Sequence, residues 1–262
     1  MRQTYPILEF DPERDAIIDP VKLIQPHPEM PEHGVITFFQ DVLEDLVAQG
    51  FAVEIASLKS EMGAHPVYVH HEQGRRVALF HPGVGAPLAA GLLEEVIALG
   101  CRKLIACGGA GVLDREIAAG HLVVPTSAVR DEGTSYHYLP PGREATPSAA
   151  GVAAIEATLG RRHVPYVLAK TWTTDGIYRE TRGKMALRRA EGCVTVEMEA
   201  AALFAVAQFR GAHLAQVLYG GDNLDADEWD SRDWQSRSDV RKMLVQLAAE
   251  ASLAIDGYAG GA

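Results

Sequence analysis

The sequence predicts an α/β protein, in which short apolar strands alternate with helices along most of the chain. Two observations lead to this class. Runs of β-branched and aliphatic residues of strand length are followed by segments with helical periodicity, and glycine-rich turns join several of them. The chain has 262 residues, of which 47% are hydrophobic and 23% charged, enough for a full-sized core. No internal repeat, low-complexity linker or break in composition interrupts residues 1–262, so we expect a single domain.

The expected elements follow in order along the chain. Residues 1–33 are rich in proline and charge and predict an irregular N-terminal arm. Strands are expected at 35–39, 51–56, 66–70, 76–80, 103–107, 121–125, 166–172, 194–196 and 214–219. Helices are expected at 41–49, 88–99, 147–159, after 180 to near 192, after 199, and at 236–256. Polar or glycine-rich connections are expected at 57–64, 81–87, 108–111, 131–143, 173–180 and 220–223.

One stretch places two carboxylates inside an apolar run, in the segment VTVEMEAAALFAVA from Val194 to Ala207. The β-branched start predicts a strand and the Ala-rich end a buried helix, so Glu197, Met198 and Glu199 lie at the junction. Ligands of open α/β sheets bind at the carboxyl ends of strands. An ionised carboxylate is costly to bury without a partner. The pair therefore either binds a ligand or, in the plainer interpretation, caps the helix and binds nothing.

Four segments resemble one known family in the same order. They are GVGAPLAAGLLEEVIALG, CGGAGVLDREIAAGHLVVPTSAVRDEG, VEMEAAALFAVA and GGDN. Together they resemble the nucleoside phosphorylase family, which includes purine nucleoside and uridine phosphorylases and related nucleosidases. The resemblance runs from about residue 33 to 255. It implies a three-layer α/β/α fold with a central mixed, twisted and partly closed sheet, and cleavage of an N-glycosidic bond at ribose C1′.

The resemblance also assigns roles to the carboxylates. Glu199 would bind the 2′- and 3′-hydroxyls of ribose, Met198 would pack against the sugar, and Glu197 would belong to the same substrate pocket. A carboxylate suits a vicinal diol because it accepts two hydrogen bonds at once. Asp222, in the GGDN segment, would assist departure of the base at N7, as a general acid does for a poor leaving group. The plainer interpretation of Asp222 is the start of an acidic loop.

The loop after strand 166–172 matches the base-recognition loop of the family by position. Asp175, Ile177, Tyr178 and Arg179 are its candidate substrate-binding residues. The Phe and Gln of the uridine-specific branch are absent, since Ile177 and Thr181 stand there. A purine-leaning specificity is therefore expected.

The phosphate site departs from the family pattern. The Arg and Ser/Thr positions are Ala106 and Gly109, and Leu43 lies where the loop after the first strand would supply an Arg. Backbone groups of Gly83, Gly85, Gly108 and Gly109 would wall the nucleophile pocket, and Lys59 of a neighbouring subunit, or else Arg130 or Arg179, would add charge. Phosphorolysis, giving free base and ribose 1-phosphate, is the first expectation. A nucleosidase that uses water and a non-catalytic nucleoside-binding protein are the alternatives.

The composition limits the classes of partner that the protein is expected to bind. The formal net charge is −11, which disfavours nucleic acid and anionic membranes, and no run of 18 apolar residues occurs. Cys101, Cys107 and Cys193 predict buried thiols in a reducing compartment, and hence the cytoplasm. The histidines lack metal-ligand spacing, so neither a metal nor a cofactor is expected, with phosphate only as a co-substrate. The resemblance and the arm predict a homo-oligomer: a dimer, trimer or hexamer.

Overall fold

The computed structural model describes residues 2–117, 119–226 and 228–255 of the chain. Strands and helices alternate along the sequence, as the hydrophobic pattern predicts. The strands are β1 (His33–Thr37), β2 (Ala52–Ser60), β3 (Gly63–Glu72), β4 (Arg75–Phe80), β5 (Lys103–Val112), β6 (Leu122–Asp131), β7 (Glu144–Ala145), β8 (Tyr166–Thr174), β9 (Cys193–Glu197) and β10 (His213–Asn223). The α-helices are α1 (Pro20–Leu23), α2 (Gln40–Ala48), α3 (Ala86–Leu99), α4 (Ala149–Arg162), α5 (Arg182–Ala190), α6 (Ala200–Arg210) and α7 (Ser238–Ala254). Short 3-10 helices are η1 (Pro6–Leu8), η2 (Thr134–His137), η3 (Ile177–Arg179) and η4 (Trp234–Ser236).

The described strands form one mixed sheet, in the order β10-β6-β8-β9-β5-β1-β4-β3-β2, with β7 paired to β6. Strand β5 pairs in parallel with β1 and β10 and antiparallel with β9. The β10–β5 pairing closes β10, β6, β8, β9 and β5 into a ring, while β1, β4, β3 and β2 extend from it as an open sheet. The mixed, partly closed sheet is therefore confirmed.

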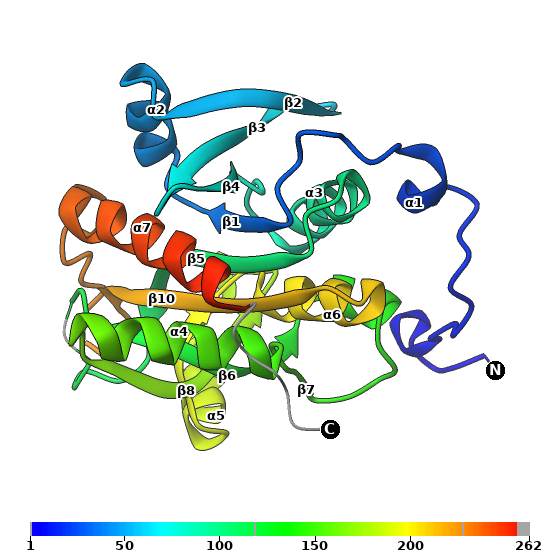
Figure 1. Ribbon diagram of the computed structural model, residues 1–262. Coiled ribbons are helices and arrows are strands. Elements are labelled where there is room, and N and C mark those ends of the chain that lie inside the picture. The colour runs from blue at the N-terminus through cyan, green and yellow to red at the C-terminus, as the bar shows by residue number, and fades with distance from the viewer. Residues whose placement is uncertain (1, 118, 227, 256–262) are drawn as a thin grey trace.

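Helices cover the sheet in two layers (Figure 1). Helices α3 and α6 pack against each other on one side, and α4 and α7 pack together on the other. Helix α6 is buried along Ala200–Ala207, as expected for a segment that is apolar on every face. The three cysteines are buried and unpaired, as predicted.

Three expected connections are wrong in their extent. The polar segment 57–64 is the end of β2 and the start of β3, joined at a tight turn, with Lys59 paired to Ala64. The glycines at 108–111 continue β5, and 220–223 continue β10, because the two strands pair with each other in parallel over this stretch. The sequence patterns missed these strand extensions for one reason. Pairing with a neighbouring strand supplies hydrogen bonds to the backbone, and local turn propensity does not reveal that pairing.

The N-terminal arm is mostly irregular, as predicted, but it contains the short helices η1 and α1 and packs on its own chain. Asp19 forms an ion pair with Arg210 of α6 (3.2 Å), and His27 donates its backbone N–H to Leu99 of α3 (2.9 Å). The arm thus has intrachain contacts, which weakens it as an argument for an oligomer. The predicted end of the last helix at Asp256 lies outside the described residues. Among the residues described, no helix is both long enough and apolar enough to span a membrane.

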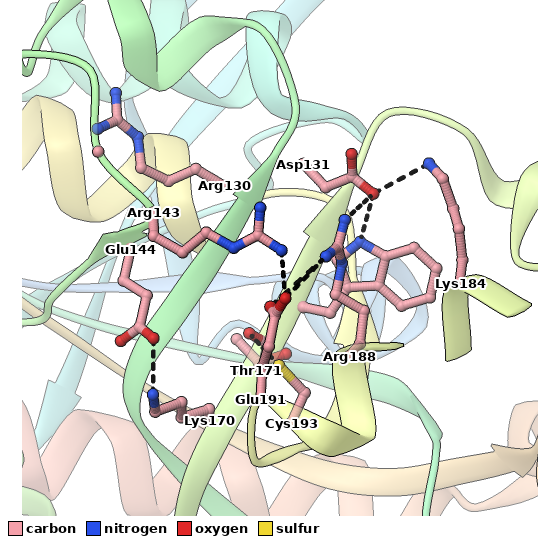
Figure 2. Close-up of polar contacts among 12 residues, drawn as sticks. Arg130, Asp131, Arg143, Glu144, Lys170, Thr171, Lys184, Arg188, Glu191 and Cys193 are labelled. Atoms are coloured by element: carbon pink, nitrogen blue, oxygen red, sulfur yellow. Dashed lines mark hydrogen bonds and ion pairs between the residues drawn. The ribbon is translucent and has the colours of Figure 1, made fainter. Parts of the chain in front are cut away.

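A cluster of ion pairs around Asp131 ties α5 to β6 and β8 (Figure 2). Asp131 Oδ2 accepts hydrogen bonds from Lys184 Nζ and Trp172 Nε1, each at 3.0 Å. Arg188 Nη2 lies 3.0 Å from the same oxygen, and Arg188 Nη1 lies 3.3 Å from Glu191. Burial alone would raise the pKa of Asp131, but the hydrogen bonds from Arg188 and Lys184 outweigh burial and lower it. The cluster anchors α5, which follows the loop at 173–180.

We expect Asp131→Asn to lower the free energy of unfolding by about 2–3 kcal/mol at pH 7, because it leaves the nearly buried Arg188 short of a charged partner. The folded-state pKa of Asp131 lies below its unfolded value. The contribution of the carboxylate is therefore present above about pH 4 and is lost as the pH falls through the folded pKa. Urea unfolding at pH 7 and at about pH 3 should show the difference shrinking in acid.

The matched control is Asp15→Asn, which removes a solvent-exposed ion pair with Lys22. It should leave the free energy of unfolding close to the wild-type value at either pH, because solvent screens the pair. Equal losses for the two variants, or a loss that is independent of pH for Asp131→Asn, would contradict the assigned role of the cluster.

Candidate active site

A cavity of about 260 Å³ lies where β5, β9 and β10 meet the start of α6. All three junction residues predicted from the sequence, Glu197, Met198 and Glu199, line it. The lining residues are Phe38, Phe39, Val84, Gly109, Ala110, Gly111, Ile177, Glu180, Val196, Glu197, Met198, Glu199, Gln216, Gly221, Asp222, Trp234 and Arg241. The cavity therefore joins segments from all parts of the chain after residue 37.

Glu197 ends β9 and caps α6. Its Oε2 accepts the backbone N–H groups of Glu199 (2.7 Å) and Ala200 (2.6 Å), and its Oε1 accepts the Thr173 hydroxyl (2.6 Å). Burial raises the pKa of Glu197, while these three donors oppose the shift. The capping interpretation thus describes Glu197 well, because both of its oxygens are engaged within the protein.

Glu199 is held by the loop that precedes α3. Its Oε1 accepts the backbone N–H of Gly85 at 2.6 Å, and the side chain borders the cavity. Burial first, and then the charge of Glu197, raise the pKa of Glu199. A ligand that donates hydrogen bonds to this carboxylate would offset both effects, and a vicinal diol is such a ligand.

Asp222 reaches the cavity from the last residues of β10. Trp229 donates its indole N–H to Asp222 Oδ2 at 2.8 Å, which orients the carboxyl group. Glu180, which sequence reasoning did not select, lines the same cavity. Burial, and then the nearby charge of Asp222, raise the pKa of Glu180 to about 7. The cavity therefore holds two neighbouring carboxyl groups of which one gains or loses a proton near neutral pH.

The four candidate residues of the loop expected to recognise the base lie in different surroundings. Ile177 borders the cavity, and Tyr178 borders an adjoining cavity of about 560 Å³ that also contacts Glu180 and Asp222. Asp175 instead accepts the backbone N–H of Gly133 (2.9 Å), away from both cavities. Arg179 is exposed and lines neither cavity. Of the four candidate residues in this loop, Ile177 and Tyr178 are the ones that line a cavity.

The glycines do not form the expected backbone nest. Gly83 donates its N–H to His81 Nδ1 (3.0 Å), and Gly85 donates to Glu199, so both groups have partners within the chain. Gly108 and Gly109 lie in the β5–β10 ladder. A Cβ atom at Gly109 would come within 3.1 Å of the ring of Tyr219, so the absence of Ser or Thr there reflects close packing.

The cations proposed for a phosphate site lie elsewhere in this chain. Lys59 is exposed on β2, the strand at the far end of the sheet order. Arg130 donates to Ser135 Oγ and to the carbonyl of Pro140, both at 2.8 Å. Arg241 does line the cavity, but its guanidinium pairs with Asp41 at 2.7 Å.

Sequence reasoning also missed Gln216 and Trp234. Gln216 could have been found, because it is the polar residue within the apolar strand LAQVLYG. Trp234 gave no such signal, since it lies in an acidic segment whose path depends on tertiary packing.

The fold and the site together define a class of protein. The phosphorylase superfamily model matches residues 32–255, and the chain belongs to this superfamily. The resemblance inferred from the four motifs is confirmed.

Curated relatives with related activities match at low identity. Guanosine phosphorylase of Halorubrum lacusprofundi is 24% identical over 177 residues, covering 65% of this chain and 73% of the relative. Uridine phosphorylase of Treponema pallidum is 31% identical over 153 residues, covering 54% of this chain and 59% of the relative.

Solved structures show the same fold. AMP nucleosidase from Bacteroides thetaiotaomicron matches with a TM-score of 0.71 and 21% identity, covering 87% of this chain and 90% of the other. Purine nucleoside phosphorylase from Toxoplasma gondii matches with a TM-score of 0.76 and 18% identity, covering 89% and 97%.

We expect Gly109→Ser to lower the free energy of unfolding by about 1–3 kcal/mol, because its side chain would press on the buried ring of Tyr219. Thermal or urea unfolding measures the loss. Gly91→Ser is the control, since a Cβ at Gly91 meets nothing within 4 Å. If the two substitutions had the same effect on stability, the packing explanation for Gly109 would be wrong.

Proposed function

We propose that this protein cleaves the N-glycosidic bond of a nucleoside, with a preference for purine bases. The observation that carries the proposal is that Glu199 and Asp222, distant in sequence, line one cavity beside Met198. Glu199 accepts hydrogen bonds from the ribose 2′- and 3′-hydroxyls, which favour its ionised form. Its negative charge then stabilises the ribose as positive charge develops at C1′.

In this proposal the carboxyl groups of Asp222 and Glu180 assist departure of the base. A purine leaves more readily when its N7 receives a proton, and Asp222 donates it in this proposal. Glu180, with a pKa of about 7, borders the same cavity and replenishes that proton at neutral pH. A pyrimidine has no N7, which supports the purine preference.

The charges of the cavity favour water as the nucleophile. Within the described chain, the lining contains the four carboxyl groups of Glu180, Glu197, Glu199 and Asp222. Arg241 is the cationic side chain in that lining, and it pairs with Asp41. A phosphate dianion needs cations or several N–H donors to offset its desolvation. Hydrolysis, which the sequence analysis placed second, is therefore the activity we propose.

Phosphorolysis, the first expectation from sequence, becomes the second candidate. The phosphorylase names of the relatives from Halorubrum and Treponema support it. It requires a neighbouring subunit to bring charge such as Lys59 to the cavity. A homo-oligomer and a cytoplasmic location both stay predictions, as does the assignment of each site residue.

We expect Glu199→Gln to keep the fold and lower kcat/KM for nucleoside cleavage by ~30-fold or more, equivalent to about 2 kcal/mol of a hydrogen bond to a charged group. The amide keeps the volume of the carboxylate but loses its charge. Base release and circular dichroism measure the two effects. Glu54→Gln, an exposed change on β2, is the control and should leave kinetics unchanged. Wild-type kinetics in a folded Glu199→Gln sample would contradict the proposed role of Glu199 in nucleoside cleavage.

A nucleoside panel tests the reaction itself. Inosine, adenosine, guanosine and uridine are each incubated while phosphate is titrated from zero, and the products are separated. We expect purine release at a rate independent of phosphate, with free ribose as product. A rate that rises from zero and saturates with phosphate, giving ribose 1-phosphate, would establish phosphorolysis instead. Uridine cleavage without purine cleavage would reverse the base preference, and binding without release would indicate a non-catalytic protein.

A further inference from the structure

A second cavity, of about 560 Å³, adjoins the cavity that holds Glu199 and Asp222. The first is called the adjoining cavity below, and the other the site cavity. Four residues line both of them, namely Ile177, Glu180, Asp222 and Trp234. The apolar lining of the adjoining cavity also includes Tyr178, Met185, Leu224, Ala226 and Trp229. The two cavities therefore share a border, and most of the second one is apolar.

Asp222 lies at this border. Its Oδ1 is 3.5 Å from the position that a Cβ atom would take at Gly111, which lines the site cavity. Its Oδ2 accepts the indole N–H of Trp229 at 2.8 Å, and Trp229 lines the adjoining cavity. Met198 and Glu199, the proposed contacts of ribose, line the site cavity but not the adjoining one. The adjoining cavity thus opens from the base end of the site cavity and not from the ribose end.

The geometry of a purine determines which of its substituents reaches the adjoining cavity. N7 and the C6 substituent lie on one edge of the base, close enough for a single side chain to contact both. C8, on the other side of N7, is bonded to the glycosidic nitrogen, so a group on C8 points back toward the sugar. A base with its N7 at Asp222 therefore directs its C6 substituent away from the ribose and past the same carboxyl group.

The exposed side chains of the adjoining cavity indicate the chemistry of its ligand. Tyr178 is 94% exposed and Trp229 is 67% exposed, and both border this one cavity together with the exposed Ile177. Large apolar side chains that are exposed together mark a binding surface. An apolar group with an aromatic ring would cover them and gain from ring contacts as well as from burial. Glu180 can accept the N–H that a C6 amino group keeps when it carries one substituent.

We propose that the adjoining cavity binds an apolar substituent on the C6 amino group of a purine nucleoside. The substrate class is then an adenosine whose amino group carries an aromatic or branched apolar group. This inference rests on the proposed cleavage of a purine nucleoside at Asp222, but not on whether water or phosphate attacks. The charged lining residues are Glu180, Asp222 and Arg182, of which two are acidic, so an acidic substituent is disfavoured.

The test compares N6-benzyladenosine with N6-methyladenosine, which share an alkylated amino group and differ in the ring. Base release is measured with and without phosphate. We expect kcat/KM of the wild type to be about 10-fold higher for the benzyl substrate, as partial burial of one ring gives, mainly through a lower KM. The matched substrates 2-benzylaminoadenosine and 2-methylaminoadenosine carry the same groups at C2, on the far side of the base from N7. They should not differ in this way.

A variant that fills the adjoining cavity ties the preference to this place. Ala226→Phe adds a ring to the lining and should lower the ratio of the two kcat/KM values from about 10 to about 1, because the new ring takes the space of the benzyl group. Ala48→Phe, an exposed change at the end of α2, should keep the wild-type ratio. Should Ala226→Phe not fold, Tyr178→Ala decides. Its loss spares the core, and the ratio should fall about 3-fold, the worth of one aromatic contact.

The outcomes separate this inference from the proposed function. If the wild type cleaves adenosine but does not prefer the benzyl substrate to the methyl one, the inference is overturned and the proposed function stands. The same conclusion follows if a folded Ala226→Phe, or Tyr178→Ala in its place, keeps the wild-type ratio, or if the benzyl group at C2 gives an equal gain. If no purine nucleoside releases its base, with or without phosphate, the proposed function fails and the inference fails with it.

Discussion

The hydrogen bonds to the buried carboxylate of Glu197 are the constraint on which the site depends. The carboxylate engages two N–H groups at the start of α6 and the hydroxyl of Thr173 on β8. It therefore joins the end of one strand, the side chain of a second and the N-terminus of a helix that is buried along Ala200–Ala207. A negative charge at a helix N-terminus is favoured by the helix dipole, which helps to offset the cost of burial. The position of Glu199 follows from this arrangement.

Closure of the sheet supplies the rest of the cavity. Because β10 pairs with β5, the ends of both strands lie beside the β9–α6 junction. Closure of the sheet also constrains the packing of individual side chains. Tyr219 on β10 packs against Gly109 on β5, and its hydroxyl donates to the carbonyl of Trp234 at 2.9 Å. The tight packing at Gly109 and the placement of Trp234 in the lining are thus consequences of one strand pairing.

The electrostatics of the cavity set it apart from an anion site. The carboxyl groups of Glu180, Glu197, Glu199 and Asp222 line the cavity. Arg241, the cation in the lining, pairs with Asp41, and the neutral amide of Gln216 lies in the same wall. Such a cavity suits a substrate rich in hydroxyl donors and a transition state with positive charge, because both interact favourably with carboxylates. The same features act against a dianionic co-substrate.

The sequence by itself determined the alternation of strands and helices, the buried helix α6 and the junction that holds Glu197, Met198 and Glu199, because hydrophobic periodicity and buried charge are local signals. Four ordered motifs also established the superfamily. Only the tertiary structure decided that Glu197 caps a helix while Glu199 accepts the N–H of Gly85 and borders the cavity. It also decided that Gly108 and Gly109 continue a strand, and that Gln216 and Glu180 face the same cavity. These properties depend on pairing between strands and on contacts between residues far apart in the chain, which no local pattern encodes.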